Sequence, residues 1–150
     1  MIRDAGYGDY HAMACMHSAN FERGWGADEI RSLLEQPGTK AFIFEHENDR
    51  AGFVLLRCVA DECEILTIAV DKTHKRKGIG RKLIDHARLH ASREGAKKIF
   101  LEVAEDNEAA QGLYAACGYA EHGRRVGYYR RWHGRRIDAL MLMRDTDEQL

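Results

Sequence analysis

The sequence holds few residues that would divide it into parts or carry it into a membrane. It contains a single proline, Pro37, and no run of glycine, serine or proline long enough to form a linker. No window approaches the ~20 apolar residues of a membrane-spanning helix, and no apolar stretch follows Arg3 as it would in a signal peptide. These absences predict one domain over residues 1–150, located in the cytoplasm.

A strong charge of one sign is missing as well. The formal net charge is -1, so no overall field favours nucleic acid or a membrane, and we expect neither as a partner. Any anion site must therefore be local. The four cysteines lack C-x-x-C spacing and lie in apolar segments, which predicts reduced core thiols and, with scattered histidines, no metal site. These cysteines are Cys15, Cys58, Cys63 and Cys117.

The first half of the chain has the pattern of two helices and several strands. Asp9 is placed to cap a helix that runs towards Asn20, and a second helix starts at Asp28 and ends before Pro37, because proline cannot continue a helix. Apolar runs between turn residues predict strands at 2–4, 40–47, 52–59 and 64–70. The last three strands are joined by short turns, so they must run antiparallel to their neighbours.

The second half changes from a strand period to a helix period. Apolar residues recur every four positions from Ile79 to Ala91, which predicts a helix over 78–93. The alternating segment 98–104 follows as a strand, and the helix between the two strands makes a crossover that sets 64–70 and 98–104 parallel.

The chain after this crossover predicts one more helix and a final hairpin. Asn107 is placed to cap a helix that Gly118 closes. Strands are expected at 119–131 and 136–144, with a turn at His133 and Gly134 between them.

A basic loop with two glycines joins the strand 64–70 to the helix 78–93. Six lysines or arginines lie between Lys72 and Lys82, and Gly78 and Gly80 stand where the helix begins. Glycine lets the main chain approach a pyrophosphate, and a helix N-terminus offers free N–H donors. Taken alone, the loop fits either an anion site or a solvated turn. It lacks the spacing of a Walker loop, and Leu83 replaces the third glycine of a Rossmann fingerprint.

The segment Ile68 to Asp71 followed by Lys75 to Gly80 resembles the acetyl-CoA signature of GNAT N-acetyltransferases, Arg/Gln-x-x-Gly-x-Gly/Ala, with Lys75 at its first position. The resemblance implies the GNAT acyl-CoA N-acyltransferase fold, a mixed α+β class with a sheet of about six or seven strands and about four helices. It also implies acetyl-CoA as cosubstrate and no metal. The cofactor-binding residues it implies are Ile68, Ala69 and Val70 on the pantetheine arm and Lys75, Arg76, Lys77, Gly78, Ile79, Gly80 and Arg81 on the pyrophosphate.

The resemblance narrows to ribosomal-protein-alanine N-acetyltransferases, which acetylate protein N-terminal amines. The residues that carry it are Gly24-Trp25-Gly26, Leu101-Glu102-Val103, Asn107, Leu113-Tyr114, Gly118-Tyr119, Tyr128-Tyr129 and Asp138-Ala139. It implies Glu102 as general base and Tyr114 as proton donor to the coenzyme A thiolate, with a backbone N–H near Ala69 or Val70 for the oxyanion. Asn107 would also contact pantetheine.

The acceptor is implied to be a protein N-terminus, in a groove lined by Trp25, Glu102, Tyr128 and Tyr129. A single carboxylate base suits an α-amine, whose pKa of ~7.7–8.0 lies below the ~10.4 of lysine. A small-molecule amine or a lysine side chain remains the alternative acceptor, and a non-catalytic acyl-CoA-binding module is a third reading. Nothing in the sequence selects an oligomeric state. The segment Arg130-Arg131-Trp132-His133 is more basic than the resemblance leads us to expect of this hairpin.

Overall fold

The computed structural model describes residues 1–147 and contains a seven-stranded sheet with four α-helices. The first half of the chain forms β1 (Ile2–Asp4), α1 (Tyr10–Asn20), α2 (Ala27–Leu34), β2 (Thr39–His46), β3 (Asp49–Val59) and β4 (Glu62–Val70). The second half forms α3 (Ile79–Arg93), β5 (Lys98–Ala104), α4 (Glu108–Ala116), β6 (Ala120–Arg130) and β7 (Arg136–Asp145). Short 3-10 turns lie at Tyr7–Asp9 and Lys72–His74. Every predicted helix and strand is present, with ends that differ by at most three residues.

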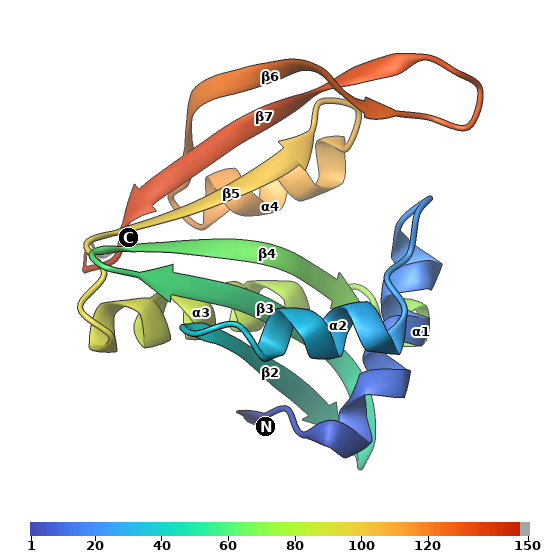
Figure 1. Ribbon diagram of the computed structural model, residues 1–150, viewed down its shortest axis with the longest axis vertical. Coiled ribbons are helices and arrows are strands. Elements are labelled where there is room, and N and C mark those ends of the chain that lie inside the picture. Colours follow the sequence, from blue (N-terminus) through green and yellow to red (C-terminus); the bar gives the residue numbers. More distant parts are fainter. Residues whose placement is uncertain (148–150) are drawn as a thin grey trace.

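The strands follow the order β1-β2-β3-β4-β5-β7-β6 across the sheet. Every neighbouring pair is antiparallel except β4 and β5, which are parallel and joined through α3 (Figure 1). The predicted meander and crossover are therefore confirmed. Because β4 and β5 run the same way, their carboxyl ends meet at the same edge of the sheet.

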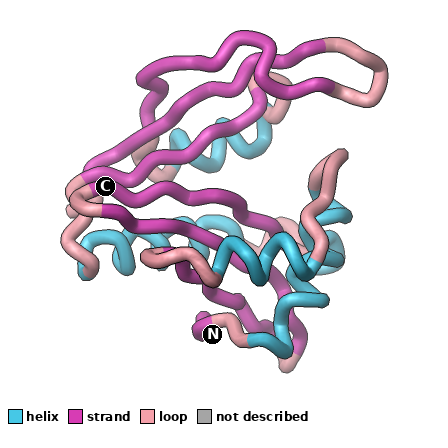
Figure 2. Tube along the Cα trace, viewed as in Figure 1, coloured by secondary structure: helices cyan, strands magenta, loops and turns pink. Residues whose placement is uncertain are grey.

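The sheet splits where its two parallel strands meet. Cα partners link β4 to β5 only from Glu62 with Lys98 to Glu64 with Phe100. Beyond that point β4 continues beside β3, and β5 continues beside β7. Figures 1 and 2 show the two halves of the sheet opening away from each other towards these carboxyl ends.

Two hydrophobic cores hold the layers together. One core packs α3 and α4 against the sheet and includes Leu83, Ile99 and Leu142, while the other packs α1 and α2 on the opposite face and includes Met13 and Phe53. Figure 1 shows α2 in front of β3 and β4, with α3 behind them. Successive side chains of β3 and β4 point alternately into these two cores, which explains why both strands are apolar along most of their length.

Asp9 differs from its predicted role as a helix cap. It stands at the N-cap position of α1, but its carboxylate makes no capping bond to that helix. Its oxygens accept hydrogen bonds from Arg3 at 2.8 Å, from Arg50 at 2.7 Å and from the Gly6 N–H at 2.8 Å. Two guanidinium groups offer stronger, charge-assisted bonds than helix N–H groups, so the carboxylate joins β1 and β3 instead.

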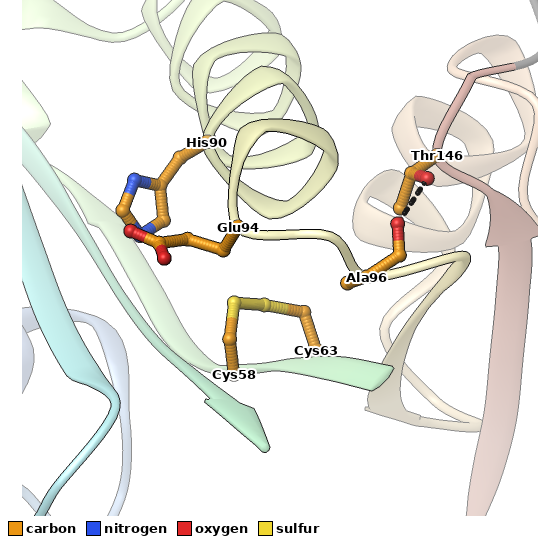
Figure 3. The surroundings of a disulfide bond; sticks show 6 residues. All are labelled: Cys58, Cys63, His90, Glu94, Ala96 and Thr146. Carbon is orange, nitrogen blue, oxygen red and sulfur yellow. Dashed lines mark hydrogen bonds and ion pairs between the residues drawn. A yellow bond between two sulfur atoms is a disulfide. The ribbon is translucent and has the colours of Figure 1, made fainter. Parts of the chain in front are cut away.

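The prediction that all four cysteines are reduced is wrong for one pair. Cys58 on β3 and Cys63 on β4 face each other in the strand register, with Cα atoms 4.1 Å apart, and form a disulfide (Figure 3). Cys15 and Cys117 are free. The disulfide exists because the tight turn at Ala60 and Asp61 puts the two side chains opposite each other, a register that spacing in the sequence does not reveal.

Candidate functional site

A cavity of about 1060 Å³ occupies the split in the sheet. Its walls come from the second half of β4, the loop after it, the start of α3, the end of β5 and the facing side of α4. It is also lined by Phe21 and Glu22, after α1, and by Tyr129 and Arg131, on the last hairpin. The volume lies at the upper end of the range for cofactor sites.

The β4 side of the cavity offers main-chain hydrogen-bonding groups. Residues 67–70 pair with β3 on one edge but have no β5 partner on the other. The predicted pantetheine contacts, Ile68, Ala69 and Val70, all line the cavity here. An extended ligand can therefore add to β4 as a further strand would.

The basic loop curves at the mouth of this cavity. Gly78 has φ of +74°, a left-handed conformation that glycine adopts without cost, and Arg76 has φ of +66°, which costs a non-glycine residue ~1 kcal/mol or more. Such turns direct successive N–H groups towards one point. The N-terminus of α3 begins directly after Gly78 and adds its unpaired N–H groups and partial positive charge. The arrangement suits a pyrophosphate.

Gly80 is required by packing rather than by backbone conformation. A Cβ atom placed there would lie 3.2 Å from Leu113 Cδ2 on α4 and 3.8 Å from Val70 Cγ2. The absence of a side chain keeps α3, α4 and the end of β4 close together under the cavity.

Asn20, at the end of α1, fastens the loop to the sheet. Its amide donates to the carbonyl of Met16 at 2.8 Å and to that of Val70 at 3.1 Å. Its oxygen accepts a bond from Lys75 Nζ at 2.8 Å. Asn20 therefore connects α1, the end of β4 and the first position of the basic signature, a role that the sequence did not reveal.

Glu102 lies on β5 just past the point where β4 and β5 separate. Its half-buried side chain lines the main cavity and also a second cavity of about 410 Å³ on the sheet face that carries Phe100 and Met141. Arg125 Nε lies 2.9 Å from Glu102 Oε1. This ion pair orients the carboxylate and leaves its second oxygen without a salt bridge in the described part of the chain.

Tyr114 lines the cavity from α4 and is 7% exposed. Its hydroxyl makes no hydrogen bond to any residue within 1–147. Burial raises the pKa of Tyr114 to about 12, so the phenol stays protonated at neutral pH and can donate a hydrogen bond. A protonated phenol with a free O–H is suited to a ligand atom that carries developing negative charge.

Most of the predicted site residues meet at this cavity. Those that line it are Ile68, Ala69, Val70, Lys75, Arg76, Gly78, Ile79, Gly80, Arg81, Glu102, Asn107, Tyr114 and Tyr129. Asn107 also caps α4, where its Oδ1 accepts the Ala110 N–H at 3.2 Å. The predicted cap is therefore confirmed, and its contact with a cofactor stays a prediction.

Three predicted site residues lie outside the cavity. Lys77 directs its ammonium group to His74, 3.4 Å from Nδ1. Trp25 stacks on His17 with ring centres 4.5 Å apart and belongs to the core under α1 and α2. Tyr128 is 52% exposed on the outside of the hairpin. An aromatic residue in a motif can serve packing or ligand binding, and only the residues that surround it in the structure distinguish the two roles.

The part of the cavity that Glu22 and Arg131 line contains contacts that the sequence did not predict. Arg131 makes two bonds to Asp106, at 3.1 and 2.6 Å, which tie the last hairpin to the loop after β5. The main-chain N–H of Trp132 donates to Glu22 Oε2 at 3.3 Å, which ties the hairpin to the segment after α1. Both links join segments that are far apart in the sequence.

No group of three or more histidine, cysteine, aspartate or glutamate residues within 1–147 is arranged to hold a metal ion. His86 and His90 lie one turn apart on α3, a spacing seen in metal sites, but both rings pack on Phe42, with centres 4.4 and 5.2 Å away. The described residues also include no helix long and apolar enough to cross a membrane.

The open sheet, the glycine loop at the start of α3 and the unpaired edge of β4 define an acyl-CoA-dependent N-acyltransferase type of fold. The model of the acetyltransferase (GNAT) family matches residues 10–119, and the chain belongs to this family of N-acetyltransferases.

Several relatives carry more specific names. The chain is 36% identical to the ribosomal protein bS18-alanine N-acetyltransferase of Escherichia coli over 101 residues, 67% of this chain and 68% of that protein. It is 38% identical to the N-alpha-acetyltransferase RimI of Mycobacterium tuberculosis over 87 residues, 58% of this chain and 51% of that protein. The crystal structure of the Escherichia coli ribosomal-protein-S18-alanine N-acetyltransferase superposes with a TM-score of 0.90 at 26% identity, over 100% of this chain and 96% of that one. Arabidopsis thaliana NAA60 in complex with acetyl-CoA has the same fold, with a TM-score of 0.83 at 17% identity over 97% of both chains.

Proposed function

We propose that this N-acetyltransferase uses acetyl-CoA and acetylates the N-terminal α-amine of a protein, with a ribosomal protein as the acceptor class. One observation carries the proposal. The free edge of β4, the Glu102 carboxylate and the free Tyr114 hydroxyl all line one cavity, at the point where the two parallel strands separate. The names of the relatives support the acceptor class.

The residues present fit acetyl-CoA. The curved main chain around Gly78 and the N-terminus of α3 suit the pyrophosphate, and the unpaired edge of β4 suits the amide-bearing pantetheine arm. When bound, acetyl-CoA supplies an activated acetyl thioester. The loop and strand would then place its acetyl group beside Glu102, because the pantetheine arm would run along β4 towards the point of separation.

Glu102 would accept the proton of the attacking amine, directly or through a water molecule. At pH 7 an α-amine with a pKa of ~7.7 has a neutral fraction about 400 times that of lysine, with a pKa of ~10.4, so one carboxylate in partial contact with solvent is a sufficient base. The Arg125 ion pair would hold that carboxylate in place.

Tyr114 would stabilise the departing sulfur. A phenol with a pKa of about 12 is a much weaker acid than a thiol with a pKa of ~8.5, so complete proton transfer from Tyr114 to the thiolate is unfavourable. We therefore assign Tyr114 a hydrogen bond to the developing thiolate, with the proton coming finally from solvent. This refines the role of proton donor that the sequence predicts.

An acceptor screen tests the proposal. The protein would be incubated with acetyl-CoA and with peptides that start with alanine or serine, with a polyamine, and with an N-terminally blocked lysine peptide, while released thiol is recorded. The proposal predicts the highest kcat/KM for the free N-terminal peptides. Faster turnover of the polyamine or the blocked lysine peptide would support the alternative acceptor class. If none of the acceptors led to thiol release, the result would support a non-catalytic module.

A further inference from the structure

The last hairpin carries a concentration of positive charge that the cofactor site does not use. Residues 123–136 contain six arginines and no acidic residue, although the whole chain has a net charge of -1. The same segment contains two tyrosines, a tryptophan and a histidine. Figure 1 shows the turn between β6 and β7 projecting beyond the end of β5.

Half of this charge is neutralised within the chain. Arg124 pairs with Asp138 at 3.0 Å, Arg125 with Glu102 at 2.9 Å, and Arg131 with Asp106 at 2.6 Å. Arg125 and Arg131 hold the hairpin on the body of the protein, whereas the pair of Arg124 with Asp138 joins the two strands of the hairpin to each other.

The other three arginines cluster at the tip of the hairpin. Arg130, Arg135 and Arg136 are exposed, and none forms a salt bridge within residues 1–147. Arg130 and Arg136 are paired across the strands, and Arg135 lies in the turn, whose Gly134 N–H donates to the Arg131 carbonyl at 2.8 Å. The charges are therefore held on a defined turn.

The tip also displays an aromatic surface. Trp132 is 86% exposed, and its ring lies 5.6 Å from that of His133. An exposed indole offers a large flat apolar face to a partner, and tryptophan is enriched at binding interfaces. The main-chain N–H of Trp132 donates to Glu22, which lines the main cavity, and so holds the tip beside that cavity.

We propose that the β6–β7 tip, defined by Arg130, Trp132, His133, Arg135 and Arg136, binds single-stranded RNA. Guanidinium groups bind phosphates, and a free indole face stacks on a base. An acidic polypeptide would satisfy the arginines but would leave the indole without a flat partner, so the combination favours RNA. The absence of a nucleic-acid partner was expected from net charge alone, which does not describe a local patch. The proposal is independent of the acceptor class.

Binding of an oligouridylate of about 16 nucleotides, labelled with fluorescein and followed by anisotropy with saturating coenzyme A present, tests the proposal. Coenzyme A keeps RNA away from the basic loop before α3. For single strands each phosphate contact contributes a slope of about -0.7 in log K against log salt, so the three arginines without a salt bridge predict about -2. The variant Arg130→Gln/Arg135→Gln should weaken binding about 60-fold at about 50 mM salt and reduce the slope to about -0.7.

The matched control is Arg93→Gln/Lys97→Gln, which removes two exposed charges near the end of α3 that form no salt bridge within residues 1–147. It should retain RNA affinity within about threefold, because it changes only distant charge. Trp132→Ala should weaken RNA binding at least about fivefold through lost stacking. Melting temperatures establish that each variant is folded.

Three results would overturn the proposal. The first is the absence of saturable RNA binding by the native protein, and the second is an equal loss in the tip variant and the control. The third is displacement of the RNA by polyglutamate at equal charge together with full binding by Trp132→Ala, which would identify an acidic polypeptide as the partner. Acetylation of a free peptide by Arg130→Gln/Arg135→Gln is a separate measurement and stays unchanged under the proposal.

Discussion

Replacing Asn20 by alanine should weaken acetyl-CoA binding much more than it slows the chemical step. The side chain bonds to the Val70 carbonyl at 3.1 Å and to Lys75 Nζ at 2.8 Å, and thereby holds the basic loop against the end of β4. We expect about 1 kcal/mol for each bond, since the bond to Lys75 is charge-assisted but exposed to water. A total of about 2 kcal/mol corresponds to about 30-fold in Kd.

The assay is isothermal titration with coenzyme A, followed by steady-state kinetics with acetyl-CoA varied. Asn20→Ala should raise Kd and KM together by 10- to 30-fold, while kcat changes by less than about threefold, because Glu102 and Tyr114 keep their places.

The control for Asn20→Ala is Thr146→Val. Thr146 is 2% exposed, and its hydroxyl donates to the Ala96 carbonyl at 2.6 Å, away from the cavity (Figure 3). This variant loses a buried hydrogen bond of similar strength, so it should lower the melting temperature without changing the Kd for coenzyme A. An unchanged Kd in Asn20→Ala, with a lower melting temperature, would reduce Asn20 to a packing role and refute the reasoning.

Four further outcomes follow from the structure. Glu102→Gln should lower kcat/KM for a peptide about 100-fold or more at pH 7, and a rate within threefold of the native one would remove Glu102 as the base. Tyr114→Phe should lower kcat about 10-fold, the effect of one lost hydrogen bond to a developing charge, with little change in the Kd for coenzyme A measured by titration. Burial lowers the pKa of His17 to about 4, from the ~6.5 of an unfolded histidine, so the unfolded chain binds more protons between these values and stability falls as pH drops through this range. Urea denaturation should therefore show up to about 2 kcal/mol less stability at pH 5 than at pH 7, and a His17→Phe variant with the same pH slope as the native protein would contradict this assignment. Thiol titration of the unfolded, unreduced protein should find two of the four cysteines reactive, Cys15 and Cys117, and all four after reduction, whereas four reactive cysteines before reduction would contradict the Cys58–Cys63 disulfide.

Regular local patterns were sufficient to predict the elements of the fold. The four-residue spacing from Ile79 to Ala91 gave α3 its buried face, and all four apolar positions of that pattern, Ile79, Leu83, Ala87 and Ala91, are buried. The short turns between β2, β3 and β4 left no alternative to antiparallel pairing. The crossover through α3 then placed the glycine loop at the carboxyl end of β4.

Contacts between distant segments could not be predicted in this way. The Cys58–Cys63 disulfide depends on one register between β3 and β4, and the contact from Asn20 to Lys75 depends on how α1 ends beside the loop. Asp9 matched a capping pattern, yet two arginines brought close by the sheet compete for it. A local motif shows what a residue can do, and the tertiary structure decides which partner it has.

The same distinction separates the site residues. The glycine loop, Glu102 and Tyr114 line the cavity because each stands at a fixed place on a strand or helix that the crossover positions. Trp25 and Tyr128 lie in irregular or twisted segments, where the direction of a side chain depends on packing with His17 and Arg125.

Tandem mass spectrometry of a single peptide tests the central claim most directly. The peptide would start with a free alanine and contain an internal lysine, and it would be incubated with acetyl-CoA and either the native protein or Gly80→Trp, whose indole would collide with Leu113 under the cavity. The account predicts one acetyl group, on the N-terminal amine, with the native protein and none with the variant. Acetylation of the lysine alone would contradict the proposed acceptor, and undiminished acetylation by Gly80→Trp would contradict the assignment of the cavity between β4 and β5 as the acetyl-CoA site.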